Sequence, residues 1–173
     1  SVAMLIAIIV TVLKYTDTNI QWIILGLIIG SFFGLLLSKY VQMTAMPQLV
    51  AVFNAFGGAA SAIVAMYEVI FQNSVDQSTF VLASVAFATI VGSVTFTGSF
   101  IAFGKLQELL TTKPILLPLR NFINIILIIA VLVLGVLLSI PEYSDVNYLY
   151  IMVGISLILG ILIVIPIGGA DMP

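Results

Sequence analysis

The chain has 173 residues, of which 62% are hydrophobic and only 7% are charged. Soluble domains carry about 25% charged residues, so a water-soluble fold of this size could not hide so much apolar surface. The net charge of −2 argues against a nucleic acid or polyanionic partner, and the absence of Cys and His excludes disulfides, thiolate metal sites and the commonest proton shuttle.

Six apolar runs follow one another along the chain, the first of them short. They cover residues 2–13, 20–37, 48–71, 79–103, 122–140 and 148–165. A helix needs about 20 apolar residues to cross a bilayer, and it closes its backbone hydrogen bonds internally. The runs are continuous rather than alternating, which argues against the strands of a β-barrel. We therefore predict an all-α integral membrane protein, a bundle of about six transmembrane helices within a larger multi-helix membrane domain.

Neither end of the sequence reads as the natural end of a domain. The chain begins inside an apolar run, without the basic region and cleavage site of a signal peptide, and it finishes in a loop-like stretch at residues 168–173. We expect a fragment of a longer membrane protein.

Basic residues are unevenly divided between the predicted loops, which indicates the orientation in the membrane. The loops after the second and fourth runs carry Lys39, Lys105, Lys113 and Arg120. The opposite loops carry one basic residue among acidic ones, namely Lys14, Asp17, Asp76, Glu142 and Asp145. We predict that the first group faces the cytoplasm or the mitochondrial matrix, together with residues 168–173.

The third run contains two polar side chains. Asn54 follows Pro47 by seven residues, which is about 10 Å along a helix. A buried amide needs hydrogen-bond partners, so Asn54 either bonds to another helix or orients water, for which the small residues after it leave room. Glu68, near the other end of this run, either reaches the interface or exchanges protons at that surface.

Hydroxyl side chains are concentrated in the fourth run. Thr89, Ser93 and Thr97 are four residues apart and share one helix face, whereas Thr95 and Ser99 lie on another. A single hydroxyl in a membrane helix usually bonds to its own backbone one turn earlier. So many hydroxyls predict either a polar path or close packing against other helices.

Four blocks of the sequence, in order, resemble the membrane domain of proton-translocating nicotinamide nucleotide transhydrogenases. They are residues 43–58 (MTAMPQLVAVFNAFGG), 92–107 (GSVTFTGSFIAFGKLQ), 113–118 (KPILLP) and 166–173 (PIGGADMP). Each block is a modest pattern, but together they are specific. The resemblance implies part of the β-subunit membrane domain, domain II, without that subunit's first span, its last two spans and the NADP(H)-binding domain after them.

The resemblance also implies an activity, which is the coupling of proton translocation to hydride transfer between NAD(H) and NADP(H). Both nucleotides would bind to soluble domains absent from this segment, which would itself hold no cofactor, metal or hydride-transfer residue. The implied partners are the lipid bilayer, the α-subunit membrane helices, the NAD(H)-binding α subunit and the NADP(H)-binding domain of the same subunit. The whole complex would be a homodimer in the bacterial cytoplasmic membrane or the mitochondrial inner membrane.

The same resemblance implies roles for single residues. Asp171 would lie where the membrane domain meets the NADP(H)-binding domain, although a turn or helix-cap role is the simpler interpretation. Many family members carry a His at the position of Asn54, where it is their leading candidate proton carrier. An Asn does not titrate. Our hypothesis is that Asn54 holds a water in the path while a titratable side chain on a partner helix is protonated.

In this hypothesis the hydroxyl residues Thr89, Ser93, Thr97 and Ser99 form the other wall of the path, and Glu68 is a candidate at the opposite surface. Two other classes of function remain open. A secondary transporter would use broken helices near the middle of the membrane, and Gly57-Gly58 is a candidate break. A purely structural membrane scaffold would move nothing.

Overall fold

The computed structural model describes residues 2–14, 20–71, 78–115, 118–143 and 145–172. These residues form six α-helices: α1 (Val2–Lys14), α2 (Ile20–Tyr40), α3 (Met46–Phe71), α4 (Thr79–Leu106), α5 (Arg120–Ser139) and α6 (Val146–Val164). Three short 3-10 helices, η1 (Met43–Ala45), η2 (Pro141–Tyr143) and η3 (Gly169–Asp171), lie between or after them. No strand occurs in the described ranges.

Five of these helices, α2 to α6, are long and apolar enough to cross a membrane. α1 has 13 residues and is shorter than a usual span of about 20. The predicted all-α membrane bundle is therefore confirmed. Large apolar side chains such as Phe53, Ile125 and Leu132 are at least half exposed, as expected where lipid replaces water as the solvent.

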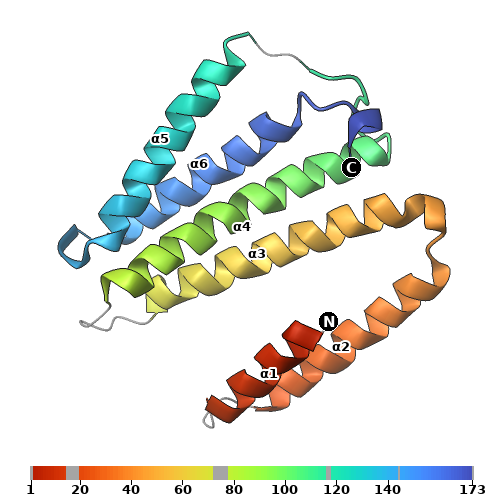
Figure 1. Cartoon of the computed structure of the whole chain (residues 1–173), viewed down its shortest axis with the longest axis horizontal. Helices are drawn as coiled ribbons and strands as arrows, with labels where there is room; N and C mark the ends of the chain where they lie inside the picture. Colours follow the sequence, from red (N-terminus) through yellow and green to blue (C-terminus); the bar gives the residue numbers. More distant parts are fainter. Residues whose placement is uncertain (1, 15–19, 72–77, 116–117, 144, 173) are drawn as a thin grey trace. The chain divides into compact units, whose positions relative to one another are not determined.

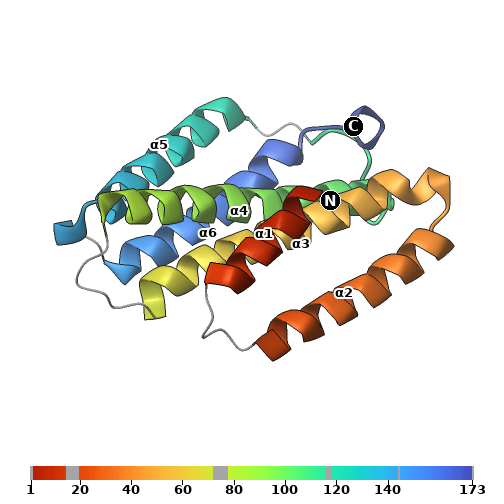
Figure 2. The ribbon, with the colours of Figure 1, turned by 60° about the horizontal axis from the view of Figure 1, so that its bottom comes forward.

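The chain divides into two compact units, residues 1–43 and 44–173. The first holds α1 and α2, and none of the residues of α2 is buried within it. The second holds the other four long helices. In Figures 1 and 2, α4 runs alongside its neighbours in the second unit, and its residues contact α3, α5 and α6. α4 is therefore the central helix of this unit.

The packing of α3 against α4 depends on two glycines. A Cβ atom at Gly58 would lie 2.7 Å from the carbonyl oxygen of Gly92, and one at Gly92 would lie 2.6 Å from that of Gly58. Only glycine permits so close an approach of two helix backbones. The buried residues of α3 are otherwise mostly alanines, spaced three or four apart: Ala51, Ala55, Ala62 and Ala65.

The candidate helix break at Gly57-Gly58 is wrong, because α3 continues through both glycines from Met46 to Phe71. Gly58 serves the contact with α4, and a Cβ at Gly57 would meet nothing within 4 Å. Both glycines have ordinary helical backbone conformations, since no glycine in the described residues has a positive φ.

The ends of the helices are defined by local capping. The Ser78 side chain accepts a hydrogen bond from the backbone N–H of Val81 at the start of α4. Asp145 accepts one from the N–H of Asn147 at the start of α6, at 2.9 Å. Both caps satisfy backbone donors that have no partner inside the helix.

Lys105 is not the loop residue that the sequence predicts. α4 extends to Leu106, beyond the predicted end at residue 103, and Lys105 lies in its last turn. Its side chain is only 1% exposed. The hydrogen bonds of its side-chain nitrogen satisfy this donor inside the protein, so the charge is compatible with a buried helical position.

Two hydrogen bonds join further segments that the sequence places on the side of the membrane with more basic residues. Gln48, near the start of α3, donates from its side chain to the carbonyl of Leu106 at 3.0 Å. The N–H of Gly169 donates to the carbonyl of Thr112 at 2.9 Å. The segment carrying Asp171 thus lies at the same end of the second unit as the loop after α4. Asp17, Asp76 and the side chain of Lys14 fall outside the described residues.

Candidate functional site

Asn54 and Ser99 meet across the interface between α3 and α4. The side-chain nitrogen Nδ2 of Asn54 donates to Oγ of Ser99 at 2.8 Å. Each helix supplies one polar group within a stretch of small residues, which lets the helices approach closely enough for this bond. The Asn54 side chain is otherwise exposed on the surface of this unit, and its oxygen has no hydrogen-bond donor among the described residues.

A cavity of about 260 Å³ adjoins this pair. Its walls come from the first half of α3, the second half of α4, the end of α6 and the segment after it. The lining residues beside Asn54 and Ser99 include Pro47, Ala51, Ala102, Ile167 and Met172. A space of this size beside two polar side chains is large enough for several waters, each of which occupies about 30 Å³ in the liquid.

Thr97 faces a different helix. Its hydroxyl Oγ1 lies 2.8 Å from the carbonyl oxygen of Leu157 on α6 and 3.3 Å from that of Ser93 on its own helix. The helices touch closely here, since a Cβ at Gly160 would lie 2.5 Å from the carbonyl oxygen of Val94. The Thr97 hydroxyl therefore joins α4 to α6 in a closely packed region.

Thr89 and Ser93 are buried on the same face of α4 as Thr97, at 0% and 2% exposure. Oγ1 of Thr89 has no hydrogen-bond partner in the described part of the chain, and neither has Oγ of Ser156 on α6, whose residue is also 0% exposed. Buried hydroxyls of this kind are usually satisfied by ordered water. The predicted site residues are thus divided between two interfaces, with Asn54 and Ser99 at one and Thr89, Ser93 and Thr97 at the other.

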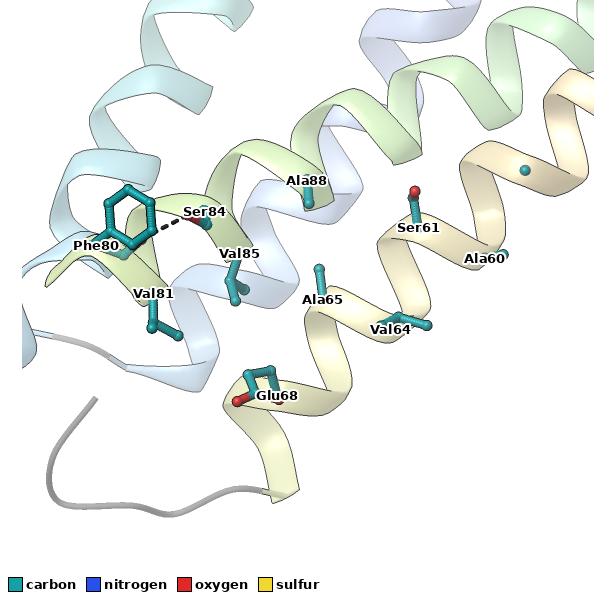
Figure 3. Close-up of a pocket in the computed structure, with 11 residues that line it drawn as sticks. Ala60, Ser61, Val64, Ala65, Glu68, Phe80, Val81, Ser84, Val85 and Ala88 are labelled. Atoms are coloured by element: carbon teal, nitrogen blue, oxygen red, sulfur yellow. Dashed lines mark hydrogen bonds between the residues drawn. The ribbon is translucent and has the colours of Figure 1, made fainter. Parts of the chain in front are cut away.

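Glu68 lies on α3 beyond Asn54 and borders a second cavity, of about 700 Å³. Figure 3 shows the side chains of Glu68, Ser61 and Ser84 around this cavity. The Ser84 hydroxyl donates to the carbonyl of Phe80 at 2.8 Å, within its own helix. Because Asn54, Ser61 and Glu68 are seven residues apart, they lie close to one face of α3 and extend about 21 Å along it.

A third cavity, of about 360 Å³, continues along the same two helices. It shares Gly57, Ser61 and Ala88 with the cavity at Glu68, and its lining includes Thr95. The two cavities are therefore adjacent. The structure does not bring Glu68 into contact with Asn54, and the lining between them is mostly apolar.

Asp171 ends the short helix η3 and is exposed. Its backbone N–H donates to the carbonyl of Gly168 at 3.1 Å, which closes a tight turn. Its carboxylate is accessible at the surface of the unit. This placement is compatible with both predicted roles, the turn and the contact with a further domain.

Sequence reasoning missed three residues at this end of the unit. The sequence predicts a loop at Lys105, and its patterns do not point to Gln48 or Gln107. Nε2 of Gln107 donates to Oε1 of Gln48 at 2.6 Å, so the two glutamines join the ends of α3 and α4. Only Lys105 has a signal in the sequence. It directly follows Gly104 at the end of an apolar run and precedes further polar residues.

The described residues contain no group of three or more Asp, Glu, His or Cys side chains close enough to hold a metal ion. The polar groups that the helices bring together are amides and hydroxyls, together with Glu68 and Lys105. Amides and hydroxyls of this kind orient water through hydrogen bonds.

Comparison with known proteins gives one family. The family described as NAD(P) transhydrogenase beta subunit matches residues 1–173. The protein named NAD(P) transhydrogenase subunit beta from Rhodospirillum rubrum is 39% identical over 180 residues, which cover 99% of this chain and 38% of the relative. The protein of the same name from a defined strain of that species matches to the same extent. The chain therefore spans about 38% of the length of these curated relatives.

Proposed function

The chain belongs to the family of NAD(P) transhydrogenase beta subunits, and we propose that it forms part of the membrane domain that conducts protons in such an enzyme. Proton movement through this domain drives hydride transfer between NAD(H) and NADP(H), which bind to soluble domains of the complex. The protein is an integral membrane protein. We place it in the bacterial cytoplasmic membrane or the mitochondrial inner membrane.

The observation that carries the proposal is the hydrogen bond between Asn54 and Ser99 beside a cavity of about 260 Å³. The cavity extends toward the end of the unit that carries Asp171, where we expect the NADP(H)-binding domain of the same subunit. The exposed side of Asn54 leaves its oxygen accessible to water or to a donor from another helix. This arrangement supports a path in which Asn54 and Ser99 hold water and a partner residue carries the charge.

The partner residue belongs to a helix outside this chain. Asn and Ser do not titrate in the physiological range, so a proton that crosses the membrane here needs an ionisable group nearby. We assign that group to a membrane helix of the α subunit, whose soluble part binds NAD(H). The complete assembly is a homodimer of this complex.

The test uses the complete enzyme in sealed vesicles, with proton uptake and hydride transfer measured together. Asn54→Ala and Ser99→Ala should lower proton-coupled turnover by about tenfold to a hundredfold, because a misplacement of about 1 Å in a reacting chain can cost a hundredfold. Asn121→Ala makes the same chemical change at an exposed position at the start of α5 and should leave turnover unchanged. Unchanged coupling in both site variants would contradict the proposal.

The same vesicles separate the other classes of function. A transporter would move its solute in the absence of nucleotide, and a scaffold would show no proton movement that depends on its own side chains. The uninterrupted helix α3 lacks the break that the transporter interpretation requires.

A further inference from the structure

Lys105 is the largest of the side chains that are almost completely buried in the described part of the molecule, with 1% exposure. A lysine at a buried position in a membrane bundle is costly unless its donors are bonded, and such residues usually have a functional role. The side-chain nitrogen Nζ donates to two backbone carbonyls, those of Ile165 at 2.5 Å and Ile167 at 2.7 Å. No described carboxylate forms an ion pair with it.

The two carbonyls lie where α6 ends. Ile165 is the C-terminal cap of α6, and the last carbonyls of a helix have no partner inside that helix. Pro166, between the two acceptors, has no N–H and cannot continue the helical hydrogen bonds. A positively charged side chain also interacts favourably with the negative end of the helix dipole. Lys105 therefore helps to hold the chain where it leaves α6, together with the N–H of Ile115, which donates to the carbonyl of Ile165 at 3.5 Å.

The segment held in this way borders the cavity beside Asn54 and Ser99. Ile167 and Met172 line that cavity, on either side of η3, and Val164 at the end of α6 lines it as well. The opposite wall includes Ser99, which lies on the same helix as Lys105, six residues before it. The bonds from Lys105 thus set the position of one wall of the cavity relative to the other.

We propose that Lys105 is a positioning residue that holds residues 165–172 as the cover on one side of the Asn54–Ser99 cavity, which is open on the side where Asn54 is exposed. This inference rests on the proposed function, in which that cavity is part of the proton path. Release of the two bonds lets Ile167 and Met172 move away and opens the cavity also toward the surface at which Asp171 is exposed. Retention of the bonds keeps this side of the cavity covered and links the position of Asp171 to that of α4.

Thiol labelling tests the cover directly, because this chain contains no cysteine. Ala102 lines the cavity and makes no side-chain hydrogen bond, so Ala102→Cys reports the access of water to it. In the complete enzyme, Lys105→Met should raise the labelling rate of this cysteine by a small water-soluble thiol reagent by roughly tenfold. That change is expected when two hydrogen bonds no longer favour the closed position. The same enzyme without the cysteine gives the background.

Three further variants show whether the effect comes from the bonds. Lys105→Arg retains the donors and should restore slow labelling, whereas the shorter Lys105→Gln should give an intermediate rate. Lys113→Met removes an exposed lysine of the following loop and should change nothing. If Lys105→Met prevents assembly of the complex, Lys105→Gln and Lys105→Arg still give the comparison. Equal labelling of Ala102→Cys in the Met or Gln variant and in the parent would overturn the proposal.

Proton coupling in the same variants separates this inference from the proposed function. Faster labelling together with a lower ratio of protons to hydride supports both. Faster labelling with an unchanged ratio supports the cover but shows that this cavity does not carry protons. Unchanged labelling overturns the role of Lys105, whether or not Asn54→Ala affects coupling.

Discussion

At the scale of single residues, the two faces of α4 have different tasks. Ser99 bonds to α3 beside a cavity, whereas Thr97 bonds to α6 where the two helices pack closely at Gly160. The sequence predicted the separation into two faces, because residues four apart in a helix share a face. It did not predict the partners, since the acceptor of Thr97 is a backbone carbonyl and every residue offers one.

Thr97→Val should destabilise the bundle by about 1 kcal/mol, the usual contribution of an interhelical hydrogen bond in a membrane protein. The substitution conserves shape and removes the donor to the carbonyl of Leu157. The midpoint of thermal unfolding of the detergent-solubilised complex measures the effect. Ser84→Ala removes a bond within one helix and should lower the midpoint less. Equal midpoints for the two variants would mean that the bond to α6 adds nothing.

The buried hydroxyl face remains a prediction as a wall of the proton path. Replacement of Ser93 and Thr97 together by Val should slow proton-coupled turnover if this face helps to hydrate the path. Turnover is measured at a temperature where the variant stays folded. If it equals that of the parent enzyme, these hydroxyl residues contribute only to helix packing.

At the scale of helices, the apolar runs predicted the elements because length and continuity are sufficient to define a spanning helix. α3 begins at Met46 where residue 48 was predicted, and α4 ends at Leu106 where residue 103 was predicted. The second difference concerns Lys105, whose charge predicts a loop although two backbone carbonyls satisfy it within the bundle. Which helices pack against one another was not predictable, because a helix that is apolar on all sides does not reveal which of its faces meets a neighbour.

Gly92→Ala should separate α3 from α4. The new Cβ would lie 2.6 Å from the carbonyl oxygen of Gly58 and 2.8 Å from the backbone nitrogen of Ala62, so backbone must move, at a cost of about 2 kcal/mol. Gly57→Ala is the matched control, because its Cβ meets nothing within 4 Å and alanine favours a helix. We expect a lower thermal midpoint and weaker proton coupling in the first variant only. A parent-like midpoint for Gly92→Ala would show that the helices can reposition without loss.

At the scale of the whole molecule, the second unit has two ends of different character. The ends of α3, α4 and α6 are joined at one of them by Gln48, Lys105 and Gly169. The opposite end carries Glu142 in η2 and the cap residue Asp145. The distribution of basic residues predicts that the first end faces the cytoplasm or matrix.

Cysteines introduced at exposed positions test this orientation. Lys113 and Glu142 are both exposed and are separated by α5, whose 20 residues extend about 30 Å. In sealed vesicles of known orientation, an impermeant thiol reagent should label Lys113→Cys from the side predicted to be the cytoplasm or matrix and Glu142→Cys from the opposite side. Labelling of both from one side would show that α5 does not cross the membrane.

The small buried residues of α3, which allow its close contact with α4, have a thermodynamic consequence. When a soluble protein unfolds, apolar surface enters water, and the resulting gain in heat capacity bends the dependence of stability on temperature. Separation of α3 from α4 within a bilayer transfers their contact surfaces, including Gly58 and Gly92, to lipid chains that are equally apolar. The heat-capacity change is then small. The free energy that holds these two helices together should fall almost linearly on heating, without the weakening at low temperature that leads soluble domains to cold denaturation.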